Sequence, residues 1–405
     1  MPYLPDAVGS VLAQRGVALE LIAVDDGSTD GSLQWLHACA AALAERRAQG
    51  AAEDTTTAYD TVVEDALGGK LAWQPGACVA ATPAEVAART SPGNALRVLA
   101  VRSSGPSGQG LALNTALAAA RGALIGEHEA DDLRPPHAFV ALRDALAANP
   151  AWDAATSRIV LGGWPRPGMQ RWADWQNSVG VCGGPQQLTA ARFVEIPALR
   201  AAGLYRREAL ARIAARPYRD LWQLPCGTLV DTAVEEGTPM PAEPLPSGWW
   251  PVDSDFFGRF FAAGLVLGKL PDALYVWRQY PAQSTRTHTR CSLDRLRACK
   301  VAFLTAARGP AERAAVPGGD ARIQLWGAGA SLDAWAADLR AAGVRCDVVG
   351  WRPGEPAPAG AWPCPDSHLV VARLWAFGME KARARVRACA PGGFDEGGRD
   401  WFVGS

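Results

Sequence analysis

Several features that would place this chain in a familiar functional class are missing from its sequence. The 40 Lys and Arg residues nearly balance the 41 Asp and Glu residues. No global basic field therefore attracts nucleic acid or an anionic membrane surface, although a local patch stays open. No apolar stretch approaches the roughly 20 residues of a membrane span, and Met1-Pro2-Tyr3 does not begin a signal peptide. We therefore expect a soluble cytoplasmic protein without a membrane partner.

The sequence also lacks the cysteine patterns of metal-binding and disulfide-rich proteins. Its nine cysteines form neither CxxC pairs nor zinc-type Cys/His spacings. Their scatter and odd number favour reduced thiols over a disulfide framework. With 405 residues, 49% of them hydrophobic, the chain is long enough for two or three domains with proper cores.

One stretch stands out, Leu19 to Ser32 (LELIAVDDGSTDGS), an apolar run that stops in two acidic residues. The run reads as a buried strand that delivers Asp25 and Asp26 to the carboxyl edge of a sheet. Open α/β folds bind their ligands at that edge. The sequence therefore predicts a binding site there.

A second acidic cluster follows another short apolar run. Residues Ala123 to His128 read as a strand, and Glu129, Asp131 and Asp132 come directly after it. Alternating strands and helices predict an α/β fold with a mainly parallel sheet, in which both clusters lie at one edge. Oxygen ligands at such an edge suit Mn²⁺ or Mg²⁺ bridging to a nucleotide diphosphate. A single Asp-Asp pair would read as a solvated turn, but two pairs after two strands favour a site.

Composition predicts the domain boundaries. Residues 50–93 lose helical periodicity and residues 215–247 are rich in Pro and Gly, so we interpret both as insertions. After a linker at about 308–320, residues 321–405 read as a separate small α/β module. Its Gly327-Ala328-Gly329 turn resembles part of a dinucleotide fingerprint, but Leu332 occupies the place of the third glycine, and we reject NAD binding.

The two acidic stretches, LELIAVDDGSTDGS and GQGLALNTALAAARGALIGEHEADD, together resemble glycosyltransferase family two with its GT-A fold. This resemblance covers residues 3–150 outside the insertion and makes 1–150 the nucleotide-sugar half and 151–307 the acceptor and catalytic half. It implies a UDP-sugar donor and a divalent metal. In the first stretch it implies that Asp26 contacts the base or ribose and that Asp25 supports the turn after the strand. In the second it implies that Asp132 is the main metal ligand, that Glu129 also binds the metal, and that Asp131 binds the metal and contacts ribose or phosphate.

The resemblance also implies roles for further polar residues. Asn114 occupies a position often used beside the nucleotide, although a polar residue that braces the sheet edge is an equally good interpretation. Arg278 has the forked donors that suit a pyrophosphate. The family often has a histidine at the position of Tyr280; His288 is a candidate substitute, and a lone histidine there is more often a surface residue.

The motif WWPVDSDFF implies the chemistry of transfer, because the family places a general base before an aromatic helix. Asp253 aligns with that base, with Asp255 in reserve, and either could instead cap the helix. We assign Trp249 and Trp250 to the acceptor side. Another aromatic pair, Trp172 and Trp175, is one helical turn apart, a spacing more often found in a core than in a sugar platform.

Short matches further along the chain (RWADWQN, FVEIP, IQLWGAGASLDAW and GRDWFVGS) resemble the subgroup called beta-1,3-N-acetylglucosaminyltransferase-like protein 1. This subgroup includes the queuosine-tRNA galactosyltransferase, which implies galactose transfer to a modified tRNA nucleoside. If so, Lys381, Arg383, Arg385 and Arg387 are candidates for phosphate contacts, although a solvated helix face is the simpler interpretation.

Two departures from the family leave an alternative open. The family's first strand, which is central in the GT-A sheet, does not appear in this sequence: either the sequence is truncated at its start or the fold lacks that strand. Val252 replaces the usual Glu before the base. A missing central strand exposes backbone and apolar surface, so we expect lower stability or a compensating partner. The alternative function is a catalytically impaired relative that binds a sugar nucleotide or tRNA. The oligomeric state is not predicted.

Overall fold

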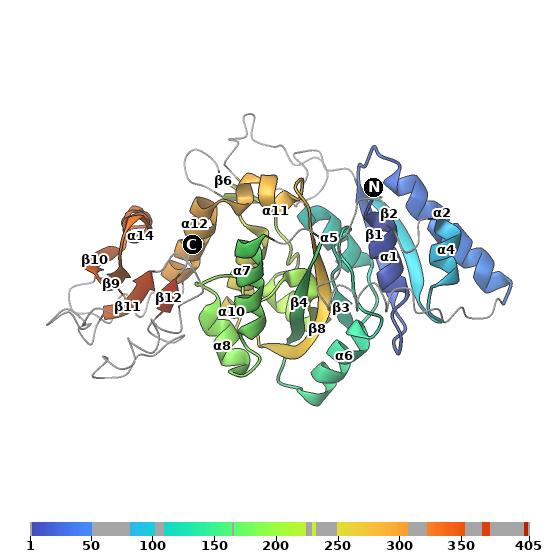
Figure 1. Ribbon diagram of the computed structural model, residues 1–405, viewed down its shortest axis with the longest axis horizontal. Helices are drawn as coiled ribbons and strands as arrows, with labels where there is room; N and C mark the ends of the chain where they lie inside the picture. The colour runs from blue at the N-terminus through green and yellow to red at the C-terminus, as the bar shows by residue number, and fades with distance from the viewer. Residues whose placement is uncertain are drawn as a thin grey trace.

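The sheet of this protein is divided into two parts, with a further small sheet near the carboxyl terminus (Figure 1). Figure 1 shows the computed structural model, with the two parts of the main sheet at the right and centre and the small sheet at the left. The structure describes residues 2–50, 82–101, 109–163, 166–223, 229–231, 249–306, 322–352, 367–372 and 401–403.

The amino-terminal part contains two parallel strands and their helices. In chain order its elements are α1 (Leu4–Leu12), β1 (Glu20–Asp26), α2 (Ser32–Ala48), α4 (Pro83–Ala88), β2 (Ala95–Val101) and α5 (Gln109–Ala119). Strands β1 and β2 pair in parallel over their full lengths. The buried side chains of Leu12, Leu36, Cys39 and Val86 join α1, α2 and α4 in one core cluster. This core holds the Asp25-Asp26 end of β1 in place.

The central sheet has the strand order β3-β5-β4-β8. Its strands are β3 (Leu124–Gly126), β4 (Ala154–Gly163), β5 (Leu204–Arg206) and β8 (Leu267–Gln279). Strands β4 and β8 are parallel, whereas the short β5 runs antiparallel to both of its neighbours. The helices of this part are α6 (Ala138–Ala148), α7 (Pro167–Ser178), α8 (Gly184–Ala191), α9 (Arg207–Ile213) and α10 (Val252–Ala262).

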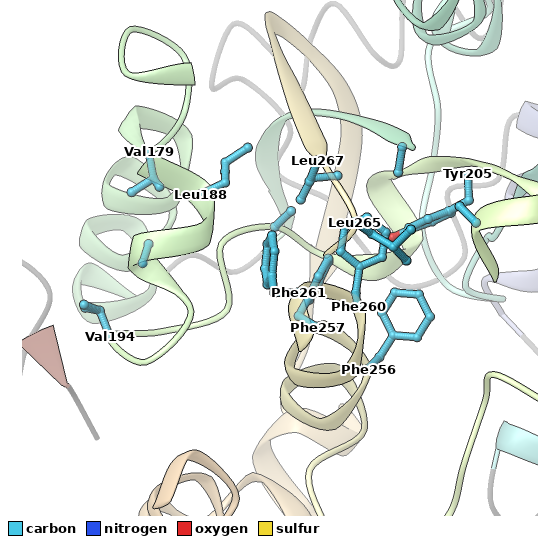
Figure 2. Close-up of a cluster of buried hydrophobic side chains, with 14 of the residues drawn as sticks. Val179, Leu188, Val194, Tyr205, Phe256, Phe257, Phe260, Phe261, Leu265 and Leu267 are labelled. Atoms are coloured by element: carbon cyan, nitrogen blue, oxygen red, sulfur yellow. The ribbon is translucent and has the colours of Figure 1, made fainter. Parts of the chain in front are cut away.

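Helix α10 supplies the aromatic centre of the largest core cluster (Figure 2). Phe256, Phe257 and Phe260 are at most 1% exposed. Their rings contact one another edge to face or at a tilt, and Tyr205 of β5 meets Phe256 at a centroid distance of 5.6 Å. Burial of several aromatic side chains fixes α10 against the sheet. The first turn of α10, which carries Asp253, is therefore rigidly positioned.

A cavity of about 370 Å³ separates the two parts of the sheet. Residues Leu19 to Ile22 of the β1 segment line one side, Leu124 to Gly126 of β3 line the other, and α5 contributes Leu113, Ala116 and Leu117. Among the described residues, no strand lies between β1 and β3. A gap with largely apolar walls thus lies between two open sheet edges.

The carboxyl-terminal module is a four-stranded parallel sheet in the order β10-β9-β11-β12. Its elements are β9 (Arg322–Gly327), α14 (Ala330–Ala341), β10 (Arg345–Gly350), β11 (Ser367–Ala372) and β12 (Trp401–Val403), and α12 (Leu293–Ala306) precedes them. The predicted α/β fold with a mainly parallel sheet and a small α/β module is confirmed. Lys381, Arg383, Arg385 and Arg387 lie outside the described residues.

Two segments of the central part have local structure of their own. The apolar residues 193–199 are not a strand, because turns carry them from α8 (Gly184–Ala191) into the short helix η1 (Arg200–Ala202). Part of the stretch 215–247, interpreted as an insertion, forms the paired strands β6 (Leu221–Gln223) and β7 (Leu229–Asp231). In the described ranges, no helix is long and apolar enough to cross a membrane.

The start of β8 depends on one small residue. A Cβ atom added to Gly268 would lie 2.0 Å from Cε3 of Trp152. We expect Gly268→Ala to lower the free energy of unfolding by about 1–3 kcal/mol, because the indole must move out of its packed position. Gly168→Ala is the matched control, since a Cβ there meets nothing within 4 Å and lies in helix α7. Equal urea midpoints for the two variants would contradict this expectation.

A buried lysine should make stability depend on pH. Lys269 is 5% exposed and donates hydrogen bonds to the carbonyls of Gln176 and Pro197. Burial, assisted by Arg158, lowers its pKa from 10.5 to about 7. Between these two values the unfolded chain holds more protons than the folded one, so the free energy of unfolding should rise with pH across this window, by an amount on the order of a few kcal/mol. We expect Lys269→Met to flatten that rise in urea titrations from pH 7 to 10, and parallel curves would be the contrary result.

Candidate functional site

One cavity of about 710 Å³ opens at the carboxyl ends of the strands. Five of the acidic residues singled out in the sequence line it: Asp26, Glu129, Asp131, Asp132 and Asp253. Asp26 ends β1, the cluster from Glu129 to Asp132 follows β3, and Asp253 lies in the first turn of α10. Elements far apart in the chain therefore bring their carboxylates to a single cavity.

The turn after β1 is built by Asp25 and glycine. Asp25 is 6% exposed, and its Oδ2 accepts a hydrogen bond of 3.0 Å from the amide of Ser28. Gly27 adopts a φ of 75°, a left-handed conformation that favours glycine. Asp25 thus closes the turn, whereas its neighbour Asp26 lines the cavity.

The second acidic cluster is held by tyrosines of and after β8. The Tyr275 hydroxyl and the Arg278 amide donate to the two oxygens of Asp132, at 2.7 and 2.8 Å. The Tyr280 hydroxyl donates to Asp131 at 2.7 Å. Asp132 is 1% exposed, and burial raises the pKa of its carboxyl well above the usual value. These contacts fix both carboxylates at the strand edge.

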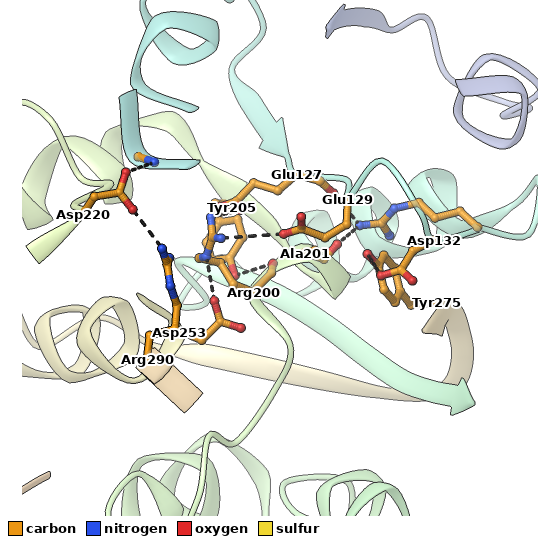
Figure 3. A network of polar contacts seen from close by, with 12 residues as sticks. Glu127, Glu129, Asp132, Arg200, Ala201, Tyr205, Asp220, Asp253, Tyr275 and Arg290 are labelled. Carbon is orange, nitrogen blue, oxygen red and sulfur yellow. Dashed lines mark hydrogen bonds and ion pairs between the residues drawn. The ribbon is translucent and has the colours of Figure 1, made fainter. Parts of the chain in front are cut away.

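Arg200, in the short helix η1, connects the two acidic groups of the cavity (Figure 3). Its guanidinium forms an ion pair with the buried Glu127, donates from Nε to Oδ1 of Asp253 at 3.1 Å, and lies 3.8 Å from Glu129. The Arg200 side chain is 1% exposed. Three carboxylates from β3 and α10 therefore share one buried cation.

The electrostatic environment of this cluster is strongly negative. The Glu129 side chain is 44% exposed. Desolvation by the surrounding residues raises the pKa of its carboxyl; the charge of Arg200 opposes this shift, and Asp131, Asp253 and Glu127 add to it. Burial likewise raises the pKa of Glu127. Like-charged carboxylates at this density favour uptake of a proton or a cation.

The two candidates for the general base occupy different environments. The Asp253 side chain is 30% exposed and lines the cavity. Asp255 is 3% exposed, and its carboxylate accepts from Arg219 at 2.5 Å and from Arg259 at 2.8 Å. It does not contribute to the described lining of the cavity. Of the two carboxylates, Asp253 is the one placed where a reacting hydroxyl could reach it.

Several other predicted site residues lie beside the cavity without lining it. The Asn114 side chain makes both of its hydrogen bonds to the backbone of Tyr218, which is the bracing role. Arg278 is 1% exposed and pairs with Asp6 of α1 at 3.1 Å. Trp249 and Trp250 are 6% and 5% exposed. His288 does line the cavity, and its ring contacts Trp249 edge on.

The acidic cluster offers only part of the ligand set of a metal ion. Within the described ranges, no group of three or more His, Cys, Asp or Glu side chains is arranged to hold a metal. Asp131, Asp132 and Glu129 all line the cavity, but both oxygens of the buried Asp132 already accept hydrogen bonds from Tyr275 and Arg278. Mg²⁺ commonly takes one or two protein carboxylates and completes its shell with water and substrate phosphates. Asp131 and Glu129 are the more exposed carboxylates of the cluster and could supply such a pair.

Some residues of the site carried no recognisable signal in the sequence. These are Glu127, Arg200, Tyr275, Arg286 and Arg290, the last three of which line the cavity. Arg200 follows an apolar run and has no motif around it. Tyr275 could have been found only from strand alternation in β8, because alternate side chains of a strand share one face.

No known protein family and no curated protein matches this chain. Among solved structures, TarS from S. aureus is 12% identical with a TM-score of 0.39, and the match covers 75% of this chain and 38% of that one. The mannosyltransferase PcManGT from Pyrobaculum calidifontis, in complex with GDP-Man and Mn²⁺, is 17% identical with a TM-score of 0.37, covering 76% of this chain and 61% of that one. A TarS chain of residues 1–349 is 15% identical with a TM-score of 0.36, covering 75% and 62%. This chain thus spans less than two thirds of each of these three chains. Because the TM-scores are below 0.5, the fold is assigned from the strands and helices described above.

Loss of the Arg200 guanidinium should strongly destabilise the folded protein. We expect Arg200→Met to lower the free energy of unfolding by about 3–5 kcal/mol, because the buried Glu127 would lose its partner. Arg121→Met is the control, since Arg121 pairs with Glu20 while 79% exposed, and such a pair contributes about 0–1 kcal/mol. Chemical unfolding of both variants measures the difference, and a change below about 1 kcal/mol for Arg200→Met would show that the network is not needed for folding.

Proposed function

We propose that this protein is an inverting, metal-dependent glycosyltransferase of the GT-A type that uses a UDP-sugar. The observation that carries the proposal is the single cavity that joins Asp26, the cluster from Glu129 to Asp132, and Asp253. Direct displacement at an anomeric carbon needs a nucleotide contact, charge neutralisation at the diphosphate, and one carboxylate base. The three groups of carboxylates match these three requirements.

The donor end of the cavity requires positive charge. A nucleotide diphosphate placed beside Asp131 and Asp132 would be repelled by their carboxylates unless a cation lay between them. In this proposal Asp132, Asp131 and Glu129 would hold Mn²⁺ or Mg²⁺, and the bound cation would supply positive charge for the diphosphate. Asp26 contacts the nucleoside, and Asp25 supports the turn.

Two arginines on the other side of the cavity are better placed for the diphosphate than Arg278. Arg286 and Arg290 line the cavity, whereas the Arg278 guanidinium pairs with Asp6. Arg286 donates to Oε1 of Gln279 at 2.6 Å, and Arg290 lies 3.7 Å from Asp220. These contacts hold the two side chains at the cavity wall, where a guanidinium can take two phosphate oxygens.

Asp253 is the base in this mechanism. Its carboxylate removes the proton from the acceptor hydroxyl as the oxygen attacks the anomeric carbon, and UDP leaves from the opposite face of the sugar. Arg200 fixes Oδ1 of Asp253 and so orients the carboxylate. The pair also keeps Asp253 aligned with the acidic cluster, because Arg200 contacts both.

The sugar and acceptor are proposed from the resemblance of the sequence alone. It favours galactose as the sugar and queuosine of tRNA as the acceptor. A second candidate function, a catalytically impaired sugar-nucleotide or tRNA-binding protein, is favoured by the gap between β1 and β3, because that gap adjoins the nucleoside-facing strand.

The proposal is tested by release of UDP. With UDP-galactose and Mn²⁺ we expect the wild type to release UDP and EDTA to stop it. Asp253→Asn should lower the rate by about 10²–10⁴-fold, because an amide cannot accept the proton. Asp294→Asn is the control, since Asp294 also lies in the first turn of a helix but its side chain is 85% exposed and outside the cavity.

Binding measurements separate the two candidate functions. A wild-type protein that binds UDP or tRNA in equilibrium dialysis but releases no UDP from any UDP-sugar would support the impaired relative. A protein that binds neither would contradict both. Full activity of Asp253→Asn would remove Asp253 from the mechanism while leaving sugar transfer in place.

A further inference from the structure

The wall of the 710 Å³ cavity that carries no donor-site acids is aromatic and apolar. It is formed by Met169 and Trp172 of α7, Leu199, and Trp277 of β8. The two indole rings lie 5.4 Å apart between centroids, inclined at 60°. Trp172 is half-buried and Trp277 is 8% exposed.

This aromatic wall rests on a rigid base. Trp277 belongs to a buried cluster with Ile159, Ala173 and Tyr275, and Trp172 packs against that cluster. The other tryptophan of α7, Trp175, points into a different cluster, the main core. The pair spaced by one helical turn is thus divided between core and cavity. An indole held in this way can bind a flat ligand without the loss of its own rotamer freedom.

The chemistry of the cavity selects the kind of ring. Six carboxylates line the cavity against two arginines, beside several amide and hydroxyl side chains. This excess of acid disfavours an anionic ring, and hydroxyl groups would find acceptors. A non-ionic ring with several hydroxyls has an apolar C–H face and polar edges. The C–H face can pack on an indole while the hydroxyl groups bind the polar side chains of the cavity. Asp253, the proposed base, lines the same cavity, so a hydroxyl of the bound ring could reach its carboxylate.

We propose that Trp172 and Trp277 form the acceptor platform, which binds a neutral hydroxylated ring. This inference rests on the proposed function and replaces Trp249 and Trp250, which do not line the cavity, whereas Trp172 and Trp277 do. Such a ring could be supplied by a saccharide or by the cyclopentenediol of a modified nucleoside. Both offer the same C–H face and the same hydroxyl groups.

Saturation-transfer difference NMR tests the platform without turnover. The probes are methyl β-D-galactopyranoside and free queuosine, each added to the protein with UDP and Mn²⁺. For at least one probe we expect transfer to the C–H protons of the hydroxylated ring. Trp172→Ala should weaken that binding about tenfold and Trp172→Phe less, because phenylalanine keeps an aromatic face. The probe that responds identifies the source of the ring.

Two comparisons make the outcome decisive. Trp152→Phe is the control, because Trp152 is half-buried at the opposite edge of the sheet, where it packs against Gly268, and its substitution should leave probe binding unchanged. The UDP signals in the same samples report on the donor site. Three results would contradict the platform. The protein binds UDP but neither probe; Trp172→Ala binds a probe as well as the wild type does; or transfer reaches only the purine-like part of queuosine. Absence of UDP binding would instead count against the proposed function, and thermal unfolding confirms that each variant is folded.

Discussion

The arrangement of the site depends on one buried guanidinium. Arg200 meets carboxylates that come from the end of β3 and from the first turn of α10, so it fixes two elements relative to each other. Its own backbone carbonyl accepts a hydrogen bond from the Tyr205 hydroxyl of β5. A buried ion pair tolerates little displacement, because either charge left alone in the interior is strongly unfavourable. The distance between the acidic cluster after β3 and the candidate base Asp253 is therefore fixed by the ion pairs of Arg200, before a donor or an acceptor binds.

A division of labour between neighbouring side chains recurs around the cavity. Asp25 closes a turn while Asp26 lines the cavity, and Asp255 binds two arginines while Asp253 lines the cavity. In both pairs the buried partner satisfies local hydrogen-bond donors. This arrangement leaves the other carboxylate accessible to a ligand, and buried polar groups that are satisfied in this way hold it in a defined position.

The sequence predicted those parts of the structure that depend on local pattern. The strand ending in Asp25 and Asp26, the cluster after β3 and the helix beginning near Asp253 all follow from apolar periodicity and its interruption. Arg200 could not be found in this way, and Tyr275 only as one of the alternating side chains of β8, because the contacts of both arise when distant segments pack together. Arg278 illustrates the same limit: its forked donors suit a phosphate, and in the structure one of its nitrogens pairs with Asp6, 272 residues away in the chain. Charge type predicts the chemistry of a residue, whereas tertiary packing decides what it meets.

The gap between β1 and β3 also has a calorimetric consequence. The apolar side chains that line it, among them Leu21, Leu113 and Leu124, already face a cavity in the folded state. Unfolding therefore exposes less new apolar surface than it would from a continuous sheet, and both the heat-capacity increment and the denaturant m-value scale with that surface. The curve of stability against temperature should accordingly be flatter, and a ligand that fills the gap would steepen it.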